Sequence, residues 1–240
     1  MVSPPRSVTP DRTGRTPGGR PWLHYVAPMA GFLVLTAAED VLPRPGGEVA
    51  PGAYAAFYAF KVAAVSVLAW LCRPAWRDLR PLPGLFWTSV AVATGLFVTL
   101  LWVALDGRVP SLPLTEGRTA FDPRGLSSPV QPLFLAARLY GLILLVPLIE
   151  ELFWRSFVIR WIIRPDFRSV PIGRVTPLAA GASAALFALA HPEWLPALAA
   201  GLLWAGLLAK SRSVAVCWIS HLTANLALGV YILATASWWF

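Results

Sequence analysis

The sequence predicts an all-α fold, a polytopic bundle of transmembrane helices. Hydrophobic residues make up 57% of the 240 residues and charged residues only 13%, which is too apolar for a soluble domain of this size. Apolar windows of about 17 to 22 residues recur along the chain, and a helix of that length crosses roughly 30 Å of hydrocarbon. Cys72 and Cys217 lie in two different apolar windows, so neither a disulfide framework nor a metal-binding thiol pair is indicated.

Seven apolar segments are expected to form the spans, or eight helical pieces if one of them is broken or re-entrant. The fourth is about 32 residues long, so as a helix it must tilt, kink or emerge from the bilayer. Pro147 lies inside it and marks the expected kink. In order, the segments are residues 22–38, 52–72, 85–105, 132–163, 176–190, 195–209 and 213–236.

Residues 1–21 precede the first span and are rich in Pro, Gly, Ser, Thr and Arg. Such a composition cannot bury a core, so we expect a disordered basic tail followed by one integral membrane domain at residues 22–240. A secretory signal would need an apolar segment near the start and a small-residue cleavage site soon after it. The tail is followed by a full-length span instead, which predicts an uncleaved anchor.

Basic residues alternate between the loops, and this alternation predicts the orientation. The side that carries the N-terminus holds most of the loop Lys and Arg residues, so we expect the N-terminus in the cytoplasm. This distribution also accounts for the formal net charge of +8 without nucleic acid as a partner. The cytoplasmic set is Arg6, Arg12, Arg15, Arg20, Arg73, Arg77, Arg80, Arg160, Arg164, Arg168, Arg174, Lys210 and Arg212; the opposite set is Arg44, Arg108, Arg118 and Arg124; Lys61, Arg138 and Arg155 lie within spans.

Three charges lie inside the fourth span, in the stretch LIEELFWR at residues 148–155. A charged side chain in hydrocarbon costs roughly 2.5 to 3.5 kcal/mol on insertion scales unless it is paired or faces water. Glu151 and Arg155 are one helical turn apart on one face, which predicts an ion pair. Glu150 is turned about 100° away from that contact. Because burial and a neighbouring negative charge make a carboxylate a stronger base, Glu150 is the better candidate for a general base.

Two of the three histidines also fall within spans. His191 ends the fifth span in the stretch FALAH. His221 lies in the seventh span, in HLTAN, where Asn225 follows one turn later and projects from the same face. A single histidine on an apolar helix is more often a satisfied interior residue, and the charges alone fit an ion network that stabilises the bundle. The set favours a catalytic site over a packing role, because it combines two histidines, an asparagine and a glutamate pair on three spans.

This set supports two forms of amide hydrolysis. In the first, Glu150 and His191 hold and deprotonate a water that attacks a carbonyl, while His221 and Asn225 donate hydrogen bonds to the oxyanion. In the second, Glu150, His191 and His221 bind Zn²⁺ with a water in the open position. The common zinc-protease signature, two histidines four residues apart with a glutamate beside the first, is absent from the sequence, so the spacing does not favour the metal.

Three motifs carry a resemblance to a known family. Residues 150–155 fit EExxxR, residues 187–191 fit FxxxH and residues 221–225 fit HxxxN. Together, and in this order, they resemble the CAAX protease and bacteriocin-processing enzyme family of intramembrane proteases, also called the Abi family, over a catalytic half at about residues 132–234. The stretches HPEWLPALAAGLLW and SRSVAVCWISHLTANLALGVYILAT further resemble a bacterial subgroup associated with exosortase sorting systems.

The resemblance implies residue roles and a cellular setting. It implies a bacterial inner membrane, a peptide or membrane-protein substrate and an exosortase-type system as a partner. The family has been interpreted as metal-dependent and as metal-free, so zinc stays open. Bacteria generally lack prenylated CAAX proteins, so the family name does not identify the substrate. The implied roles are water activation by Glu150 and His191, oxyanion binding by His221 and Asn225, and support by Glu151 and Arg155.

Two other functions are open to the same residues. A non-catalytic immunity or scaffold protein would keep the polar cluster for packing, and a proton-coupled transporter would use it to relay protons.

The depths of the site residues set a geometric condition for an enzyme. On ideal helices Glu150 and His221 lie about 15 Å and about 12 Å from the cytoplasmic ends of their spans, and His191 about 22 Å. A shared site needs similar depths, so we expect the fifth helix to start deeper or the following hairpin to re-enter.

Overall fold

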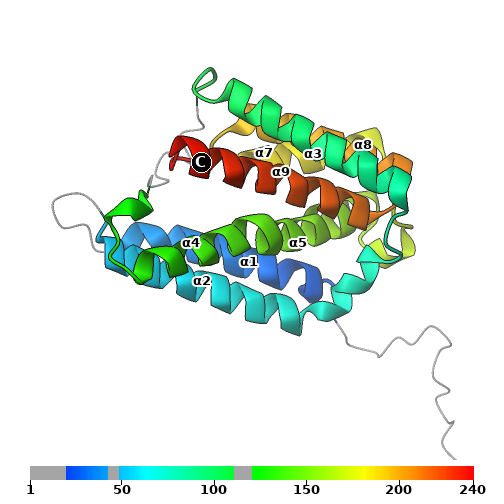
Figure 1. Ribbon diagram of the computed structural model, residues 1–240. Coiled ribbons are helices and arrows are strands. Elements are labelled where there is room, and N and C mark those ends of the chain that lie inside the picture. Colours follow the sequence, from blue (N-terminus) through cyan, green and yellow to red (C-terminus); the bar gives the residue numbers. More distant parts are fainter. Residues whose placement is uncertain (1–19, 43–48, 111–120) are drawn as a thin grey trace, which may run out of the picture.

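A computed structural model describes residues 20–42, 49–110 and 121–240, and in these ranges the chain is helical with no strand (Figure 1). The all-α bundle predicted from the sequence is therefore confirmed. The expected disordered tail lies outside the described residues, except for its last two positions.

The predicted spans correspond one by one to the helices of the described ranges. Among these, α2, α3, the continuous helix Val130–Ile163, α8 and α9 are long and apolar enough to cross a membrane. The other two, α1 and α7, have 15 and 13 residues, fewer than the roughly 20 that cross the hydrocarbon untilted. The bounds are α1 Leu23–Ala37, α2 Pro51–Leu71, α3 Leu85–Leu105, α7 Pro177–Leu189, α8 Trp194–Ser211 and α9 Val214–Thr235.

The fourth span is one helix with two irregular stretches. Its α-helical parts are separated by π-helical segments, in which the backbone hydrogen bonds reach one residue further than in an α-helix. The expected kink at Pro147 falls at the start of α5, directly after the first π segment. In order, the parts are α4 Val130–Tyr140, η6 Gly141–Leu145, α5 Val146–Glu151, η7 Leu152–Val158 and α6 Ile159–Ile163.

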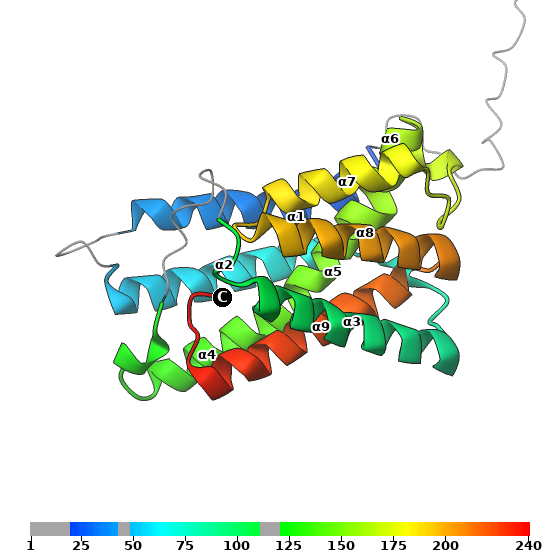
Figure 2. The ribbon, with the colours of Figure 1, turned by 90° about the horizontal axis from the view of Figure 1, so that it is seen from above.

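The long helix runs through the middle of the bundle. Figure 1 shows α1, α2 and α4 along one side, and α3, α7, α8 and α9 along the other, with α5 between them. From above, in Figure 2, α1 and α7 lie along one edge and α4 and α9 along the opposite edge. The main helix pairs are α3 with α9, α7 with α8 and α1 with α2. Residues on α5 are therefore placed to meet side chains from both sides.

Gly95 lets α3 approach α9 at the turn that carries His221. A Cβ atom at Gly95 would collide with the backbone oxygen of Ser220 and would lie 3.0 Å from the backbone nitrogen of Ala224. One turn later Thr99 donates a hydrogen bond to the carbonyl of Ala224 at 2.8 Å. Small residues and buried hydroxyls are common at such close contacts in membrane bundles. Here they fix α9 against α3.

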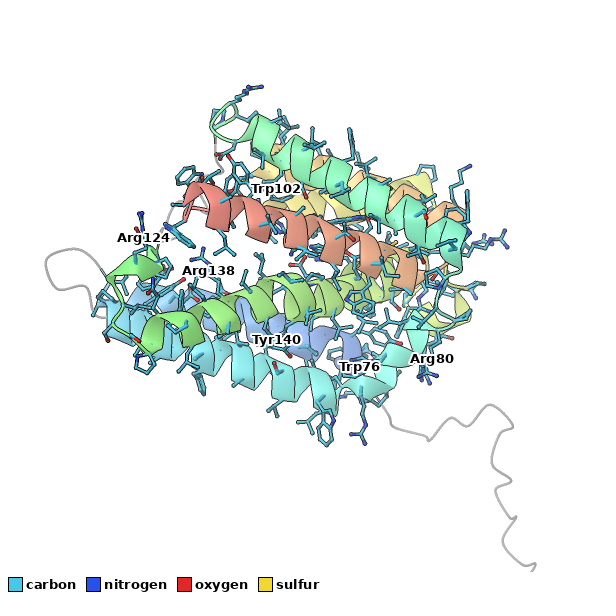
Figure 3. The ribbon with its side chains drawn as sticks, in the orientation of Figure 1. Trp76, Arg80, Trp102, Arg124, Arg138 and Tyr140 are labelled. Atoms are coloured by element: carbon cyan, nitrogen blue, oxygen red, sulfur yellow. The ribbon has the colours of Figure 1, made fainter. Side chains whose placement is uncertain are left out.

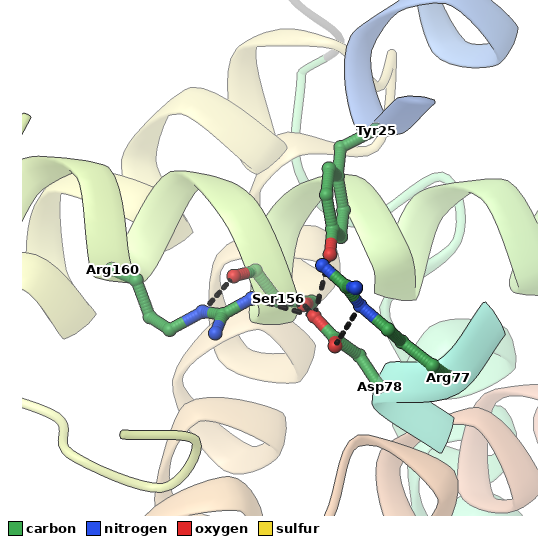
Figure 4. Close-up of polar contacts among 5 residues, drawn as sticks. All are labelled: Tyr25, Arg77, Asp78, Ser156 and Arg160. Carbon is green, nitrogen blue, oxygen red and sulfur yellow. Dashed lines mark hydrogen bonds and ion pairs between the residues drawn. The ribbon is translucent and has the colours of Figure 1, made fainter. Parts of the chain in front are cut away.

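A polar cluster around Asp78 links several elements at the end of the bundle where α2 connects to α3 (Figure 4). Asp78, in the short 3-10 helix η3 (Arg73–Leu79), accepts hydrogen bonds from Tyr25 at 2.8 Å, from Ser156 at 2.6 Å and from Arg160 at 2.6 Å. The guanidinium of Arg77 lies 3.8 Å from the same carboxylate. The connection between α2 and α3 is thereby anchored to α1 and to the long helix.

Candidate active site

Glu151 stands at the centre of a buried chain of ionic contacts. One of its carboxylate oxygens, Oε1, lies 2.9 Å from Nδ1 of His221, and the other, Oε2, lies 3.2 Å from Nε of Arg155. The side chains of Glu151 and Arg155 are 0% exposed and that of His221 is 5% exposed. The ion pair predicted between Glu151 and Arg155 is present, and it extends to His221 on α9.

Two aromatic rings enclose this chain. The guanidinium carbon of Arg155 lies 5.3 Å from the ring centre of Phe187 and 5.4 Å from that of Trp204, within the range of cation–π contacts. Trp204 also stacks on His221, with ring centres 4.2 Å apart and planes at 24°. Its indole nitrogen donates to the hydroxyl of Ser220 at 3.0 Å. The His221 ring is therefore held on one face by Trp204 and at one edge by Glu151.

Glu150 faces a different space from Glu151. It lines a cavity of about 230 Å³, whereas Glu151 and Arg155 are not among the residues that line it. The Oε2 atom of Glu150 lies 3.9 Å from Nε2 of His221. The two adjacent carboxylates thus contact opposite nitrogens of one imidazole ring, as their separation by about 100° on the helix allows.

His191 follows the end of α7 and lines the same cavity. Its Nδ1 atom lies 2.8 Å from the carbonyl oxygen of Phe187, one turn earlier in the chain. The ring centre of His191 lies 4.4 Å from that of Phe187 and 5.7 Å from that of Trp102 on α3. Glu150, His191 and His221 therefore share one cavity in spite of the depths expected from ideal helices. The shortness of α7 accounts for part of that difference.

Asn225 completes the long helix where its hydrogen bonds are interrupted. In η6 the backbone N–H of Val146 donates to the carbonyl of Gly141, and the next residue, Pro147, has no N–H. Neither residue can then donate to the carbonyl of Leu142. The side-chain amide of Asn225 donates to that carbonyl at 2.8 Å. Asn225 lines the cavity as well, so it serves both the backbone and the site.

The cavity takes its walls from most of the helices and from the last residues of the chain. Its lining combines the acidic and imidazole groups described above with aromatic and basic side chains. The lining residues are Phe32, Thr36, Glu39, Tyr54, Tyr58, Lys61, Val98, Thr99, Trp102, Arg138, Leu142, Val146, Glu150, Phe187, His191, Glu193, Trp204, His221, Ala224, Asn225, Leu228, Trp238, Trp239 and Phe240.

The zinc alternative requires Glu150, His191 and His221 to converge on one ion. In the part of the chain that the structure describes, no group of three or more His, Cys, Asp or Glu side chains is placed to hold a metal ion. The Nδ1 atoms of both histidines are engaged, one by the Phe187 carbonyl and the other by Glu151, which leaves their Nε2 atoms as the nitrogens that a metal would use. As placed in the described chain, the side chains of Glu150, His191 and His221 therefore do not converge as a metal site.

Residues 132–227 match a family model described as Type II CAAX prenyl endopeptidase Rce1-like. The matched segment holds all three motifs and the whole ionic chain. Through this segment, which is less than half of the chain, the protein is similar to the CAAX protease and bacteriocin-processing enzyme family, and the match supports membership of it. The apolar helices and the match together indicate an integral membrane protein, and the match supports a CAAX-protease-like intramembrane peptidase in general. No curated protein and no solved structure matches the chain.

The match leaves part of this CAAX-protease-like site uncovered. The helices α1, α2 and α3 precede residue 132, yet they supply cavity residues such as Glu39, Lys61 and Trp102. The subgroup associated with exosortase systems stays a prediction from the sequence.

Trp204, Phe187 and Arg138 are site residues that sequence reasoning did not assign. Phe187 stood only as the first position of the FxxxH motif, and Trp204 had no signal, because nothing local distinguishes it from the other tryptophans. Arg138 did carry a signal, as a charged residue inside a predicted span.

Replacing Glu151 with Gln is expected to lower the free energy of unfolding by about 3 to 5 kcal/mol, because it leaves the Arg155 charge buried without its partner. The measurement is chemical denaturation of the purified protein in detergent. The matched control is Glu150→Gln, which removes the neighbouring carboxylate but spares the ion pair and is expected to change stability less. Equal losses in the two variants would contradict the assignment of separate roles.

Proposed function

We propose that the protein is an intramembrane endopeptidase that hydrolyses a peptide bond near the C-terminus, or in a membrane segment, of a protein substrate. The observation that carries this proposal is the single cavity that Glu150, His191, His221 and Asn225 all line. Amide hydrolysis needs a base to activate water and donors to stabilise the oxyanion, and this set contains both.

In the first step Glu150 accepts a proton from a water molecule that His191 helps to orient. The water oxygen bonds to the carbonyl carbon of the substrate, and the carbonyl oxygen takes up the negative charge. In the second step the proton held by Glu150 passes to the leaving nitrogen, and the C–N bond breaks. Because the same group takes and returns the proton, Glu150 ends the cycle as a carboxylate.

His221 supports the oxyanion through its contact with Glu151. If Nδ1–H of His221 donates to Glu151, Nε2 donates to an oxyanion only when the ring is protonated. The Glu151 carboxylate lies at Nδ1 and the indole of Trp204 stacks on the ring, so both hold the imidazole in place. Glu151 is therefore a positioning residue, and its supporting role is to orient the His221 ring.

Asn225 acts inside the cavity, beside His221, and Arg155 acts outside it, on the far side of Glu151. The amide group of Asn225 has two N–H donors, and its hydrogen bond to Leu142 uses one of them, which leaves the other for the oxyanion. Arg155 pairs with the Glu151 carboxylate from outside the cavity.

Glu150→Gln is expected to abolish cleavage, since it preserves shape but removes the base, a loss of about 10²- to 10⁴-fold. His191→Ala and His221→Ala are expected to be inactive too, whereas Asp122→Asn, an exposed carboxylate outside the cavity, retains activity. The measurement is a mass-spectrometric comparison of membrane-protein termini and fragments between cells that carry each variant.

Full activity of Glu150→Gln would overturn the assignment of the base. Fragment patterns that stay identical when the protein is deleted would favour the immunity or scaffold alternative. Uptake that depends on the pH gradient, without any cleavage, would favour the transporter.

Elemental analysis of the purified, active protein tests the metal alternative. We expect cleavage to persist after chelation, because the donor atoms do not converge as a metal site. Stoichiometric zinc that leaves together with activity would instead establish a metalloendopeptidase, with Glu150, His191 and His221 as its ligands.

We further propose that the N-terminus is cytoplasmic, in a bacterial inner membrane, so that the cavity lies in the extracytoplasmic half. Arg138 and Arg124 lie at the end of the bundle opposite to Arg80 and the other basic loops (Figure 3). The cavity residues Glu39 and Lys61 lie toward this sparsely basic end as well. With most of the loop Lys and Arg residues inside, the substrate would reach Glu150 from outside the cytoplasm.

Labelling of single introduced cysteines tests this orientation. Ser127 and Ser169 are exposed residues at the two ends of the bundle, and the native Cys72 and Cys217 are buried. With a membrane-impermeant maleimide on intact spheroplasts, Ser127→Cys is expected to react and Ser169→Cys to react only after lysis. The reverse pattern would invert the proposed orientation.

A further inference from the structure

The segment Ala236 to Phe240, directly after α9, turns back over the cavity instead of continuing the helix. Ala236 has a φ of 55°, the left-handed conformation in which helices commonly end. Figure 2 shows the chain turning there from the end of α9 toward the middle of the bundle. The next residues bring three aromatic side chains, Trp238, Trp239 and Phe240, into the wall of the cavity. We call residues 236–240 the strap.

Side chains from opposite sides of the bundle hold the strap. Arg138, in α4, donates hydrogen bonds to the main-chain oxygen of Phe240 at 2.9 Å and to that of Trp238 at 3.3 Å. Asp106, which directly follows α3, accepts a hydrogen bond from the indole nitrogen of Trp239 at 3.0 Å. Because α4 and α3 lie on opposite sides of α5 (Figure 1), these bonds join the two sides of the bundle across the cavity.

The strap is held less firmly than the helices around it. Its aromatic residues belong to no helix, and Trp239 is 53% exposed. The indole N–H of Trp238 is buried without an acceptor in the described part of the chain. A buried donor without a partner destabilises the closed position. Exposed hydrogen bonds outside regular elements also open at a lower free-energy cost than packed helices do.

The size of the cavity shows that a wall must move before a substrate enters. Its volume is about 230 Å³, whereas pockets that hold drug-sized ligands measure roughly 300 to 1,000 Å³. A peptide of several residues is at least as large as such a ligand. Most of the other lining residues lie on the helices of the bundle, so the strap is the part of the wall that is displaced at the lowest cost.

We propose that the strap is a gate, which closes the cavity in this structure and opens when its bonds to Asp106 and Arg138 are released. The opening lies at the end of the bundle where α3 ends, and it gives access to the cavity that Glu150 lines. Such gating goes beyond the proposed function, because it controls access for any molecule that binds in the cavity. Closure after entry also excludes water from the site.

The reaction of a cysteine placed inside the cavity measures this opening. The reporter is Leu228→Cys in the full-length protein in detergent, because Leu228 lines the cavity and is not one of the catalytic candidates. The probe is a bulky disulfonated stilbene maleimide. The native Cys72 and Cys217 are buried and do not line the cavity, so they give little background. We expect the reporter to react more slowly than Ser127→Cys, which is at an exposed position.

Changes to the bonds of the strap are expected to speed up the reaction of the reporter. Trp239→Phe removes the indole donor but keeps an aromatic ring, and Asp106→Ala removes the acceptor. Each is expected to raise the rate about three- to tenfold, as for the loss of one hydrogen bond. Together they are expected to act no more strongly than either alone, since they break the same bond. Arg138→Met removes the other bonds and is expected to raise the rate as well.

Trp194→Phe is the matched control. The indole nitrogen of Trp194 donates to the carbonyl of Pro110 at 3.1 Å, a bond that involves no strap residue, and Trp194 does not line the cavity. This variant is expected to leave the rate of the reporter unchanged. The native Cys217 is the control for general loosening of the bundle, and it is expected to stay unlabelled in every variant.

Four results would overturn the gate. They are an unchanged rate in both Trp239→Phe and Asp106→Ala, additive effects of these two changes, an equal rise in the Trp194→Phe control, and labelling of Cys217 together with the reporter. A reporter that already reacts as fast as Ser127→Cys in the unaltered strap would also overturn it, because the cavity would then be open.

The labelling experiment involves no cleavage, so its outcome is distinguishable from that of the peptidase proposal. Failure of the gate leaves the peptidase proposal as it stands. Labelling that follows the strap variants, without any cleavage in cells, would keep the gate and remove the protease.

Discussion

The rest of the site depends on one buried contact, the carboxylate of Glu151 between Arg155 and His221. A lone charge in the interior of a membrane bundle is costly. In this chain of contacts the Glu151 carboxylate and the Arg155 guanidinium compensate each other. It joins the long helix to α9, while Phe187 from α7 and Trp204 from α8 close over it. Four helical segments are thus fixed around one carboxylate, and the same carboxylate sets the orientation of the imidazole that faces Glu150.

The irregular backbone of the long helix is linked to this arrangement. The π-helical segment η6 and Pro147 leave the carbonyl of Leu142 without a donor from the following residues of the helix, and Asn225 supplies one from α9. The second segment, η7, contains Arg155 and lies beside the Asp78 cluster. Both π segments therefore coincide with places where the helix contacts its neighbours through polar groups, as is common for π segments near functional sites. A straight α-helix would present these side chains in a different register.

The two ends of the cavity have different origins. The end near Glu150 and His221 is built mainly from the segment that matches the CAAX-protease model, with Trp102 of α3 beside His191, whereas α1 and α2 supply Glu39 and Lys61 from outside that segment. Arg138 lies within the matched segment but donates hydrogen bonds to main-chain oxygens of Phe121 and Phe240, which lie outside it.

The sequence by itself determined the helices and the identities of the polar candidates. Length and apolarity are local properties, so all seven segments emerged with bounds close to those observed, and Glu150, Glu151, Arg155, His191, His221 and Asn225 were identified by their rarity in apolar spans. Only the tertiary structure decided that Glu151 contacts His221, that Trp204 stacks on that ring and that Arg138 meets the main-chain oxygen of Phe240. The physical reason is that spacing along one helix fixes which residues share a face, whereas contacts between helices depend on rotation, depth and close approach at points such as Gly95.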